Sequence, residues 1–80
     1  MKNDQYDIFL KEVGKNIRRI RKKQGLTMEA VANDSEIEYR QLGRIERGEG
    51  NSTIITLQRL AEVMKVDIHQ FFIFPNKNIK

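Results

Sequence analysis

The spacing of apolar residues at the start of the chain most strongly limits the folds open to it. They recur at intervals of four, three, four and three residues, at Tyr6, Leu10, Val13, Ile17 and Ile20. This spacing is typical of one face of an amphipathic helix, which we expect to run from about Asp4 to Gln24. Gly25 ends it, because glycine adopts the left-handed conformation found at helix C-termini. Gly14 indicates either close packing or a weak joint within the helix.

Two short helical segments follow, separated by the polar, turn-like residues 33–36. Thr27 is expected to cap the first of them, which continues to about Asn33. The second is expected to run from about Tyr39 to Arg47, where Gly48 follows. Two helices joined by so short a turn must cross steeply, which is the geometry of a helix-turn-helix.

The remaining sequence predicts two more helices. Ser52 or Thr53 is expected to cap the first, whose inward stripe consists of Ile54, Leu57, Leu60, Ala61 and Met64. Asp67 is expected to cap a short fifth helix that holds Ile68, Phe71 and Phe72. Because no strand pattern occurs, we predict an all-α fold, a compact five-helix bundle. It forms a single domain of residues 1–80, with its core at about 13–72 and tails at 1–5 and 75–80.

The residue types present argue against an enzyme. The chain has no cysteine, which excludes disulfides, thiolate nucleophiles and cysteine-based zinc sites. His69 is the only histidine, and no second ligand or catalytic partner accompanies it, so we expect no metal site. No glycine-rich phosphate loop precedes a helix with a lysine. We therefore expect no cofactor.

The charge and the hydropathy pattern bear on partners and location. The formal net charge of +4 makes a polyanion plausible as a partner, although many small proteins carry such a charge for solubility alone. The N-terminal segment has acidic residues where an export signal needs an apolar core, and the apolar runs are too short to span a bilayer. We expect a cytoplasmic protein with no membrane partner.

Several short motifs occur in a consistent order between Val13 and Phe72. They are Ile17-x-x-Ile20-Arg21, Gly25-Leu26-Thr27, Val31-Ala32, the string IERGEGN at 45–51, Leu57-x-x-Leu60-Ala61, and Val66 with Phe71-Phe72. In these motifs the chain resembles the helix-turn-helix family of lambdoid-phage repressors and Cro, also called the XRE family. Each motif alone is weak, whereas the whole series in order is specific.

The resemblance implies that the helix beginning near Tyr39 is a recognition helix, whose first residues meet base edges in the major groove. The matching positions are Tyr39, Arg40, Gln41 and Arg44. Arginine can donate to guanine O6 and N7, and glutamine can pair with adenine N6 and N7. Tyr39 can contact a thymine methyl or a phosphate, or instead pack under the turn.

The resemblance also implies a set of phosphate contacts and one structural ion pair. Helix N-termini attract phosphates through free backbone N–H groups and the helix dipole. The expected phosphate contacts lie at the N-termini of the second and fourth helices and in the intervening loop. The residues are Thr27, Met28, Arg47, Asn51, Ser52 and Thr53, extending to Ile54. The family pairs an arginine of the first helix with a glutamate of the third, and the matching residues are Arg21 and Glu46.

Three positions depart from the family pattern. Glu36 stands in the tight turn where glycine is common, which indicates strain or a different turn. Met28 replaces a glutamine that contacts phosphate, so its side chain does not take that role. Glu38 replaces a serine, threonine or aspartate, and its carboxylate repels phosphate unless it accepts from a cytosine N4. These departures affect the details of docking rather than the fold.

Two segments keep more than one interpretation. A basic run is read as the solvated outer face of the first helix, with attraction to a DNA backbone as the alternative: Lys11, Lys15, Arg18, Arg19, Lys22 and Lys23. The apolar C-terminal cluster is either the plug of the core or an interface between two copies, comprising Met64, Ile68, Phe71, Phe72 and Phe74. We favour a homodimer, because one recognition helix makes little specific contact by itself.

Together these features predict sequence-specific binding of double-stranded DNA by a transcriptional regulator. A homodimer would occupy a pseudo-palindromic operator, and no small-molecule effector is expected because no effector domain fits in 80 residues. One alternative is an antitoxin or restriction-control protein that regulates its own operon. Another is an adaptor that binds a protein partner through the aromatic patch at residues 71–74.

Overall fold

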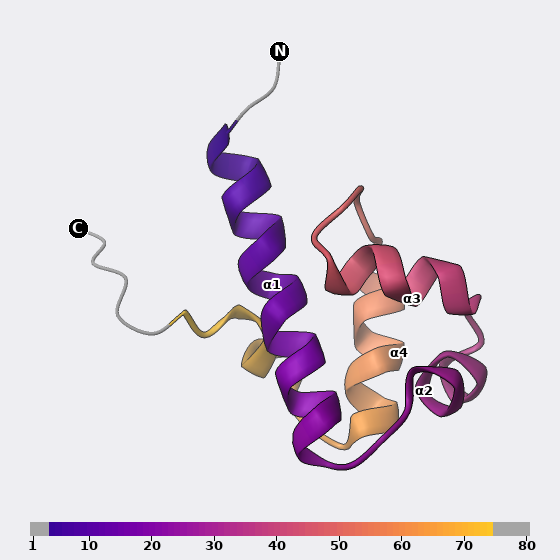
Figure 1. Cartoon of the computed structure of the whole chain (residues 1–80). Coiled ribbons are helices and arrows are strands. Elements are labelled where there is room, and N and C mark those ends of the chain that lie inside the picture. The colour runs from indigo at the N-terminus through magenta and orange to yellow at the C-terminus, as the bar shows by residue number, and fades with distance from the viewer. Residues whose placement is uncertain (1–3, 75–80) are drawn as a thin grey trace.

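A computed structural model describes residues 4–74 of the chain, which form four α-helices and one 3₁₀ helix (Figure 1). They are α1 (Asp4–Lys23), α2 (Met28–Ser35), α3 (Tyr39–Glu46), α4 (Ile54–Met64) and η1 (Ile68–Phe72). The predicted all-α class is confirmed, and no strand occurs in residues 4–74. The expected fifth α-helix is a 3₁₀ helix instead. Of the expected tails, residues 1–3 and 75–80 lie outside the described residues.

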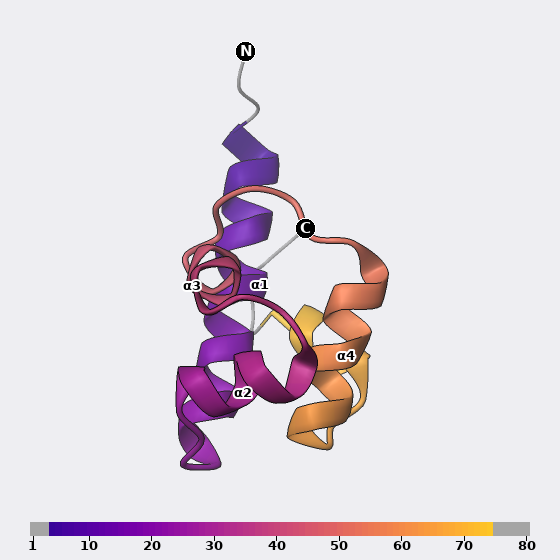
Figure 2. The ribbon, with the colours of Figure 1, turned by 90° about the vertical axis from the view of Figure 1, so that its right-hand side faces the viewer.

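The five elements pack in a ring of pairwise contacts that α4 and η1 complete. α1 contacts α3 and η1, while α2 contacts α3 and α4. Figure 2 shows α1 and α3 on one side of the molecule and α4 on the other. α1 has 20 residues, yet neither it nor any shorter helix in residues 4–74 is apolar enough to cross a bilayer.

One apolar core joins all five elements. Its buried side chains are Val13, Ile17, Ile20, Val31, Ala32, Leu42, Ile45, Leu57, Leu60, Ala61, Met64 and Phe71. The predicted stripes supply most of them, but two members were assigned inward wrongly. Tyr6 is 61% exposed and Ile54 is 66% exposed. Both lie in the first turn of a helix, at its solvent-exposed end.

The helix ends follow local capping chemistry. The hydroxyl of Thr27 accepts from the Ala30 N–H at 3.1 Å, and that of Thr53 accepts from the Thr56 N–H at 3.1 Å. Thr53, rather than Ser52, is therefore the cap of α4. Asp67 precedes η1 but makes no side-chain capping bond, so that prediction was wrong. α2 also continues two residues beyond the expected Asn33.

Gly14 lies at the closest approach of α1 to α3. A Cβ atom placed there would lie 2.5 Å from the Ile45 carbonyl oxygen and 2.6 Å from the Glu46 carbonyl oxygen. α1 is continuous through this position. Of the two interpretations of Gly14, close packing is therefore confirmed and the weak joint is wrong. The contact sets the distance at which α1 holds the C-terminal end of α3.

Candidate nucleic-acid interface

The turn between α2 and α3 determines how α3 leaves the body of the protein. Glu36 has φ 61° and ψ 40°, in the left-handed region that costs a non-glycine residue about 1–2 kcal/mol. The N–H groups of Glu36 and Ile37 donate to the Asn33 and Ala32 carbonyls at 3.1 and 3.0 Å. Ile37 packs against the core and holds this conformation in place. The expected strain at Glu36 is confirmed.

α3 buries one face and exposes the other. Its buried residues are Leu42, Gly43, Ile45 and Glu46. The four predicted base-reading residues, Tyr39, Arg40, Gln41 and Arg44, are all exposed. Tyr39 is 55% exposed, so it does not pack beneath the turn. The helix period therefore separates the packing residues from a hydrogen-bonding surface of two arginines, one glutamine and one tyrosine.

A polar groove of about 320 Å³ runs between α3 and the loop that leads to α4. Its α3 wall is formed by Arg40, Gln41 and Arg44, and its loop wall by residues 49–52. Arg44 lies close to the loop, because a Cβ atom on Gly50 would lie 3.1 Å from its Nη2 atom. The groove brings three of the four predicted base-reading residues together with the predicted phosphate-binding residues Asn51 and Ser52, whereas Tyr39 does not line it.

Arg47 makes an ion pair that the sequence analysis missed. Its Nε and Nη2 atoms donate to the two Glu49 carboxylate oxygens at 3.0 and 3.3 Å. This hydrogen bond raises the pKa of Arg47 and lowers the pKa of Glu49. The spacing of two residues in a loop carries no helical or strand periodicity that would have indicated the contact. Arg47 keeps further N–H groups for a phosphate, with Glu49 as a competing acceptor.

The N-termini of α2 and α4 both open to solvent near α3. Thr27 is exposed, and the Met28 side chain is half-buried against the core. At α4, Thr53 and Ile54 are exposed and Ser52 is half-buried. Each cap hydroxyl binds one first-turn N–H and leaves the other N–H groups of that turn available to an anion.

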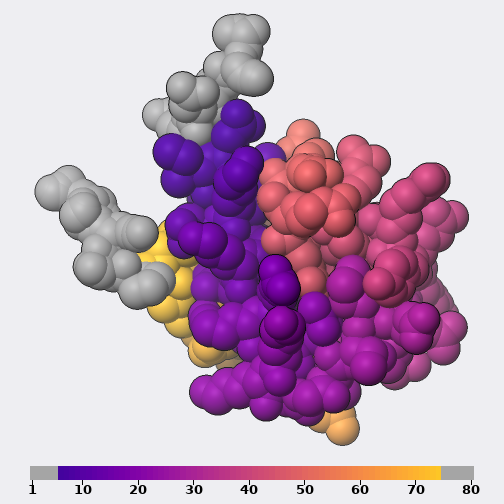
Figure 3. All heavy atoms as spheres, in the orientation of Figure 1, coloured from indigo at the N-terminus to yellow at the C-terminus, as the bar shows by residue number. Residues whose placement is uncertain are grey.

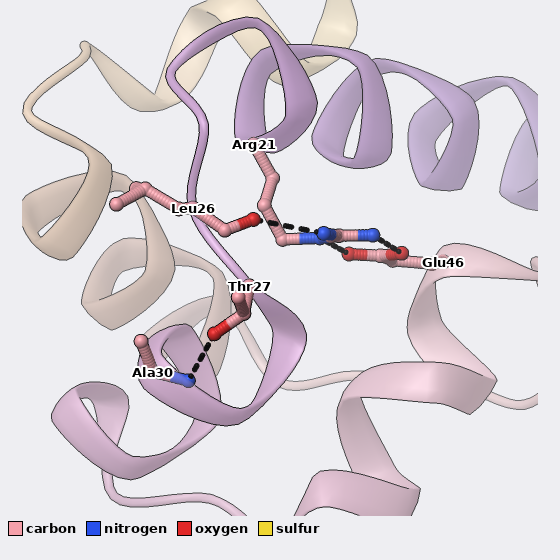
Figure 4. A network of polar contacts seen from close by, with 5 residues as sticks. All are labelled: Arg21, Leu26, Thr27, Ala30 and Glu46. Atoms are coloured by element: carbon pink, nitrogen blue, oxygen red, sulfur yellow. Dashed lines mark hydrogen bonds and ion pairs between the residues drawn. The ribbon is translucent and has the colours of Figure 1, made fainter.

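The predicted pair of Arg21 and Glu46 forms in the interior (Figure 4). Arg21 Nε donates to Glu46 Oε2 at 2.7 Å, and Nη2 donates to Oε1 at 2.9 Å. Its Nη1 donates to the Leu26 carbonyl at 3.0 Å. The hydrogen bond to Glu46 raises the pKa of Arg21. One guanidinium thus joins α1, α3 and the loop that carries the α2 cap.

The C-terminal segment is held by contacts that the sequence did not reveal. Asn16 Nδ2 donates to the carbonyls of Phe71 and Ile73, each at 2.9 Å. Phe9 stacks on Phe72 with ring centroids 6.3 Å apart and meets Phe74 edge-on at 5.7 Å. A single asparagine on a helix gives no signal of a partner 55 residues away. These contacts fix η1 and the residues after it against α1.

Two residues of the predicted dimer interface belong instead to the core. Met64 and Phe71 are buried within one chain and offer no surface to a second, so their assignment was wrong. Ile68, Phe72 and Phe74 are partly buried against the core. Apart from Tyr39 on α3, the exposed large apolar residues are Tyr6, Ile8, Phe9, Ile54, Ile55 and Ile73.

An apolar groove of about 300 Å³ adjoins this surface. It lies between the N-terminal half of α1, the loop before α4, and the start of α4. Its apolar lining consists of Phe9, Leu10, Val13, Ile45, Ile54, Leu57 and Phe72. It shares Ile45 and residues 50–52 with the polar groove, so the two grooves lie on either side of the same loop.

Comparison with known sequences gives a consistent result. A helix-turn-helix family model matches residues 17–71, which include the last part of α1 and the whole of α2, α3 and α4. The chain is 43% identical over 56 residues to an uncharacterized HTH-type transcriptional regulator of Sinorhizobium fredii. That match covers 70% of this chain and 73% of the relative.

Solved structures share the fold. The restriction-modification controller protein C.AhdI of Aeromonas hydrophila is 27% identical, with a TM-score of 0.77 over 79% of this chain and 96% of that one. SinR, a master regulator for biofilm formation solved in complex with DNA, is 27% identical, with a TM-score of 0.69 over 74% and 95%. The chain therefore belongs to the XRE-type helix-turn-helix family of transcriptional regulators.

Proposed function

We propose that the protein binds a specific double-stranded DNA sequence by inserting α3 into the major groove. The observation that carries this proposal is the exposed side of α3, where Arg40, Gln41 and Arg44 line one polar groove. The buried Arg21–Glu46 pair supports this helix from behind, so its side chains are presented on a rigid element. The similar regulator SinR was solved with DNA, which supports the same role here.

The chemistry of the groove suits base edges. Arg40 and Arg44 offer paired donors to guanine, and Gln41 offers a donor and an acceptor to adenine. Tyr39, at the start of α3, is placed to contact a thymine methyl or a phosphate. Glu38 stands outside the helix without a capping bond, which leaves its carboxylate available to accept from a cytosine N4. We propose these side chains as the base-reading set.

Phosphates on either side of the groove would bind at the two open helix N-termini. Thr27 and the Met28 backbone form one anchor, and Ser52, Thr53 and the Ile54 backbone form the other. Asn51 and Arg47 add side-chain donors from the loop. Because phosphate contacts set register without reading sequence, we propose that these residues position α3 rather than select the site.

The proposal is tested by selecting bound duplexes from a random pool, which yields the operator and its symmetry. On the selected duplex, Arg40→Ala or Arg44→Ala is expected to weaken binding by about 1–3 kcal/mol, because a bidentate base contact is lost. The base preference at one position should relax at the same time. Titration of each variant against the operator and its single-base variants measures both effects.

Asn51→Ala is the matched control for the base-reading variants. It should weaken binding to the operator and to unrelated duplexes by the same factor, because it removes a phosphate contact only. If Arg40→Ala and Arg44→Ala bind every duplex as the unchanged protein does, the assignment of α3 as the reading element is wrong. Failure of the unchanged protein to enrich any duplex would overturn the proposed function itself.

We further propose that two copies associate through the apolar groove beside the loop. The groove borders the C-terminal end of α3, so association there would bring two recognition helices together for an operator whose half-sites lie in successive major grooves, about 34 Å apart. Ile54 is exposed at the groove edge, and a second copy would remove it from water. This interface replaces the one predicted from Met64 and Phe71, which lie in the core.

Ile54→Gln is expected to raise the dimer dissociation constant at least tenfold. Full burial of an isoleucine contributes about 1.5–3 kcal/mol, and each tenfold change corresponds to about 1.4 kcal/mol. Ile55→Gln is the matched control, because Ile55 is 62% exposed but lies outside the groove. Sedimentation equilibrium measures the dimer dissociation constants of both variants. An equal effect of the two variants contradicts the groove, and a monomeric protein on DNA contradicts the dimer.

Control of its own operon in a restriction-modification system is a second candidate for the biological role. The similarity to C.AhdI extends over 96% of that controller, which favours it over an antitoxin role. The aromatic cluster near Phe72 and Phe74 is engaged with Phe9, which disfavours an adaptor role. Finding the selected operator upstream of the chain's own coding sequence would support autoregulation. We propose that the protein acts in the cytoplasm and that no small-molecule effector controls it.

A further inference from the structure

We propose that α1 carries a second, sequence-independent contact with duplex DNA, made by a line of four cations beside α3. These residues, here called the α1 basic column, are Lys11, Lys15, Arg18 and Lys22. The proposal rests on the proposed function, since it extends the DNA contact of the same surface. It assigns a binding role to residues that the sequence alone favoured as a solvated helix face.

The column follows from the helix period. Its members stand at positions i, i+4, i+7 and i+11 of α1, which lie along one side of an α-helix. All four are exposed, whereas Val13, Ile17 and Ile20 occupy the buried side. At a rise of about 1.5 Å per residue, the column is about 16 Å long. It is therefore long enough to follow several phosphates of one duplex.

The N-terminal end of the column, at Lys11, adjoins the loop before α4. A Cβ atom on Gly48 would lie 2.6 Å from the Lys11 Cα, so the loop backbone packs directly on α1 at this point. The charge of Lys11 also contributes to lowering the pKa of Glu49, after the larger effect of the Arg47 hydrogen bond. Lys11 is thus next to the loop that holds one proposed phosphate anchor.

The C-terminal end of the column, at Lys22, adjoins the other proposed phosphate anchor, at the start of α2. Lys22 lines a shallow hollow together with Thr27, Met28 and Tyr39. The same lysine borders a second, more open hollow lined by cations alone: Lys15, Arg18, Arg19, Lys22 and Lys23. Lys22 therefore connects the basic surface of α1 with the start of α2 and the first residue of α3.

α1, the helix that carries the column, lies on the same side of the molecule as α3 (Figure 2). Figures 1 and 2 together place α1 and α3 on one side and α4 on the other. Figure 3 shows that side as a continuous surface, with α1 directly beside α2 and the loop that follows α3. A duplex engaged by α3 and both anchors would therefore lie close to the column.

The charge of the column is almost uncompensated. Lys15 lies 3.7 Å from Glu12 but is 73% exposed, and such exposed pairs contribute little. Among residues 6–74, no carboxylate lies within ion-pair distance of Lys11, Arg18 or Lys22. A row of free cations matches a polyanion of regular charge spacing. Continuity with both anchors favours the DNA backbone over an acidic protein.

The test compares two variants that remove the same charge from opposite sides. Lys15→Ala/Arg18→Ala removes two cations from the column without removing a core contact. Arg59→Ala/Lys65→Asn removes two exposed cations from α4 and its C-cap, where asparagine tolerates the left-handed conformation of residue 65. The affinities for the selected operator and for an unrelated duplex are measured over a range of salt concentrations, with thermal melts to verify folding.

For the column variant, the slope of log affinity against log salt should become less steep by about 1.8. Each phosphate contact contributes about 0.9 to this slope through counterion release. The α4 variant should keep the slope of the unchanged protein, and the column variant should keep its base preference. Lys15→Arg/Arg18→Lys should restore the slope, because it preserves both charges.

Equal slopes for the column and α4 variants would overturn the inference. So would a column variant whose slope is unchanged while its base preference shifts. Either result leaves operator binding by the unchanged protein intact, so it differs from failure of the proposed function. If the proposed function itself fails, the unchanged protein binds no duplex at any salt concentration.

Discussion

Replacing Glu46 with alanine is expected to lower the free energy of unfolding by about 3–5 kcal/mol, because it leaves the buried Arg21 guanidinium without its partner. The two side chains are only 8% and 5% exposed, so water does not replace the lost carboxylate. The bond from Arg21 to the Leu26 carbonyl would remain and would stabilise only part of the charge. Urea unfolding followed by circular dichroism measures the loss.

The double variant Arg21→Met/Glu46→Leu tests the physical reason. It removes both charges and fills the site with side chains of similar volume, so it should recover most of the stability lost in Glu46→Ala. Arg47→Ala is the comparison at an exposed pair, where the partner Glu49 remains in water and little stability is lost. A cost below about 1 kcal/mol for Glu46→Ala would contradict the assignment of the pair as a buried structural link.

The pair also connects stability with function. Arg21 holds Glu46 at the end of α3 and the Leu26 carbonyl just before the α2 cap, so it fixes both helices of the motif with one group. Loss of Glu46 would therefore loosen the element that carries the proposed base-reading side chains. We expect weaker operator binding in any Glu46→Ala protein that remains folded at low temperature.

Gly14→Ala is expected to destabilise the protein by about 1–3 kcal/mol, although alanine favours helices over glycine by about 1 kcal/mol. The new Cβ would lie within 2.5–2.9 Å of three atoms, all of them in the backbone of Ile45 and Glu46. Backbone atoms cannot rotate away as a side chain does, so α1 and α3 would have to separate. Thermal unfolding measures the effect.

Gly43→Ala in α3 is the matched control. There the nearest atom to a new Cβ is Arg47 Nη1 at 3.1 Å, the mobile end of an exposed side chain. The helix preference of alanine should then dominate, and the variant should be unchanged or stabilised by up to about 1 kcal/mol. Equal destabilisation of both variants would show that α1 and α3 do not meet as closely as described.

Much of the site was predictable because it depends on local periodicity. The exposed set Tyr39, Arg40, Gln41 and Arg44 follows once α3 is recognised as a helix with Leu42 and Ile45 inward. The cap at Thr27 follows from its own hydroxyl and the apolar residues after it. These features arise from interactions between residues that are only a few positions apart in the sequence. The local sequence is therefore enough to predict them.

Other features depend on which surfaces meet, and the sequence misled at several of them. The stripe of α4 was extended to Ile54 and that of α1 to Tyr6, because periodicity does not say where the neighbouring helix ends. The apolar residues Met64 and Phe71 were placed at an interface, yet one chain buries them. Asp67 was expected to cap the last helix, and its side chain does not.

The helical segments, the inner and outer faces of α3, and the resemblance that paired Arg21 with Glu46 could all be read from the order of residues. Three other features became visible only in the folded chain: Gly14 meets the backbone of α3, Asn16 binds the carbonyls of the C-terminal segment, and Lys11 and Lys22 adjoin opposite proposed phosphate anchors. The two groups differ in the range of the interactions that produce them. Helix period and capping act within about four residues, whereas packing distances and charge neighbours arise only when segments far apart in the chain are brought together.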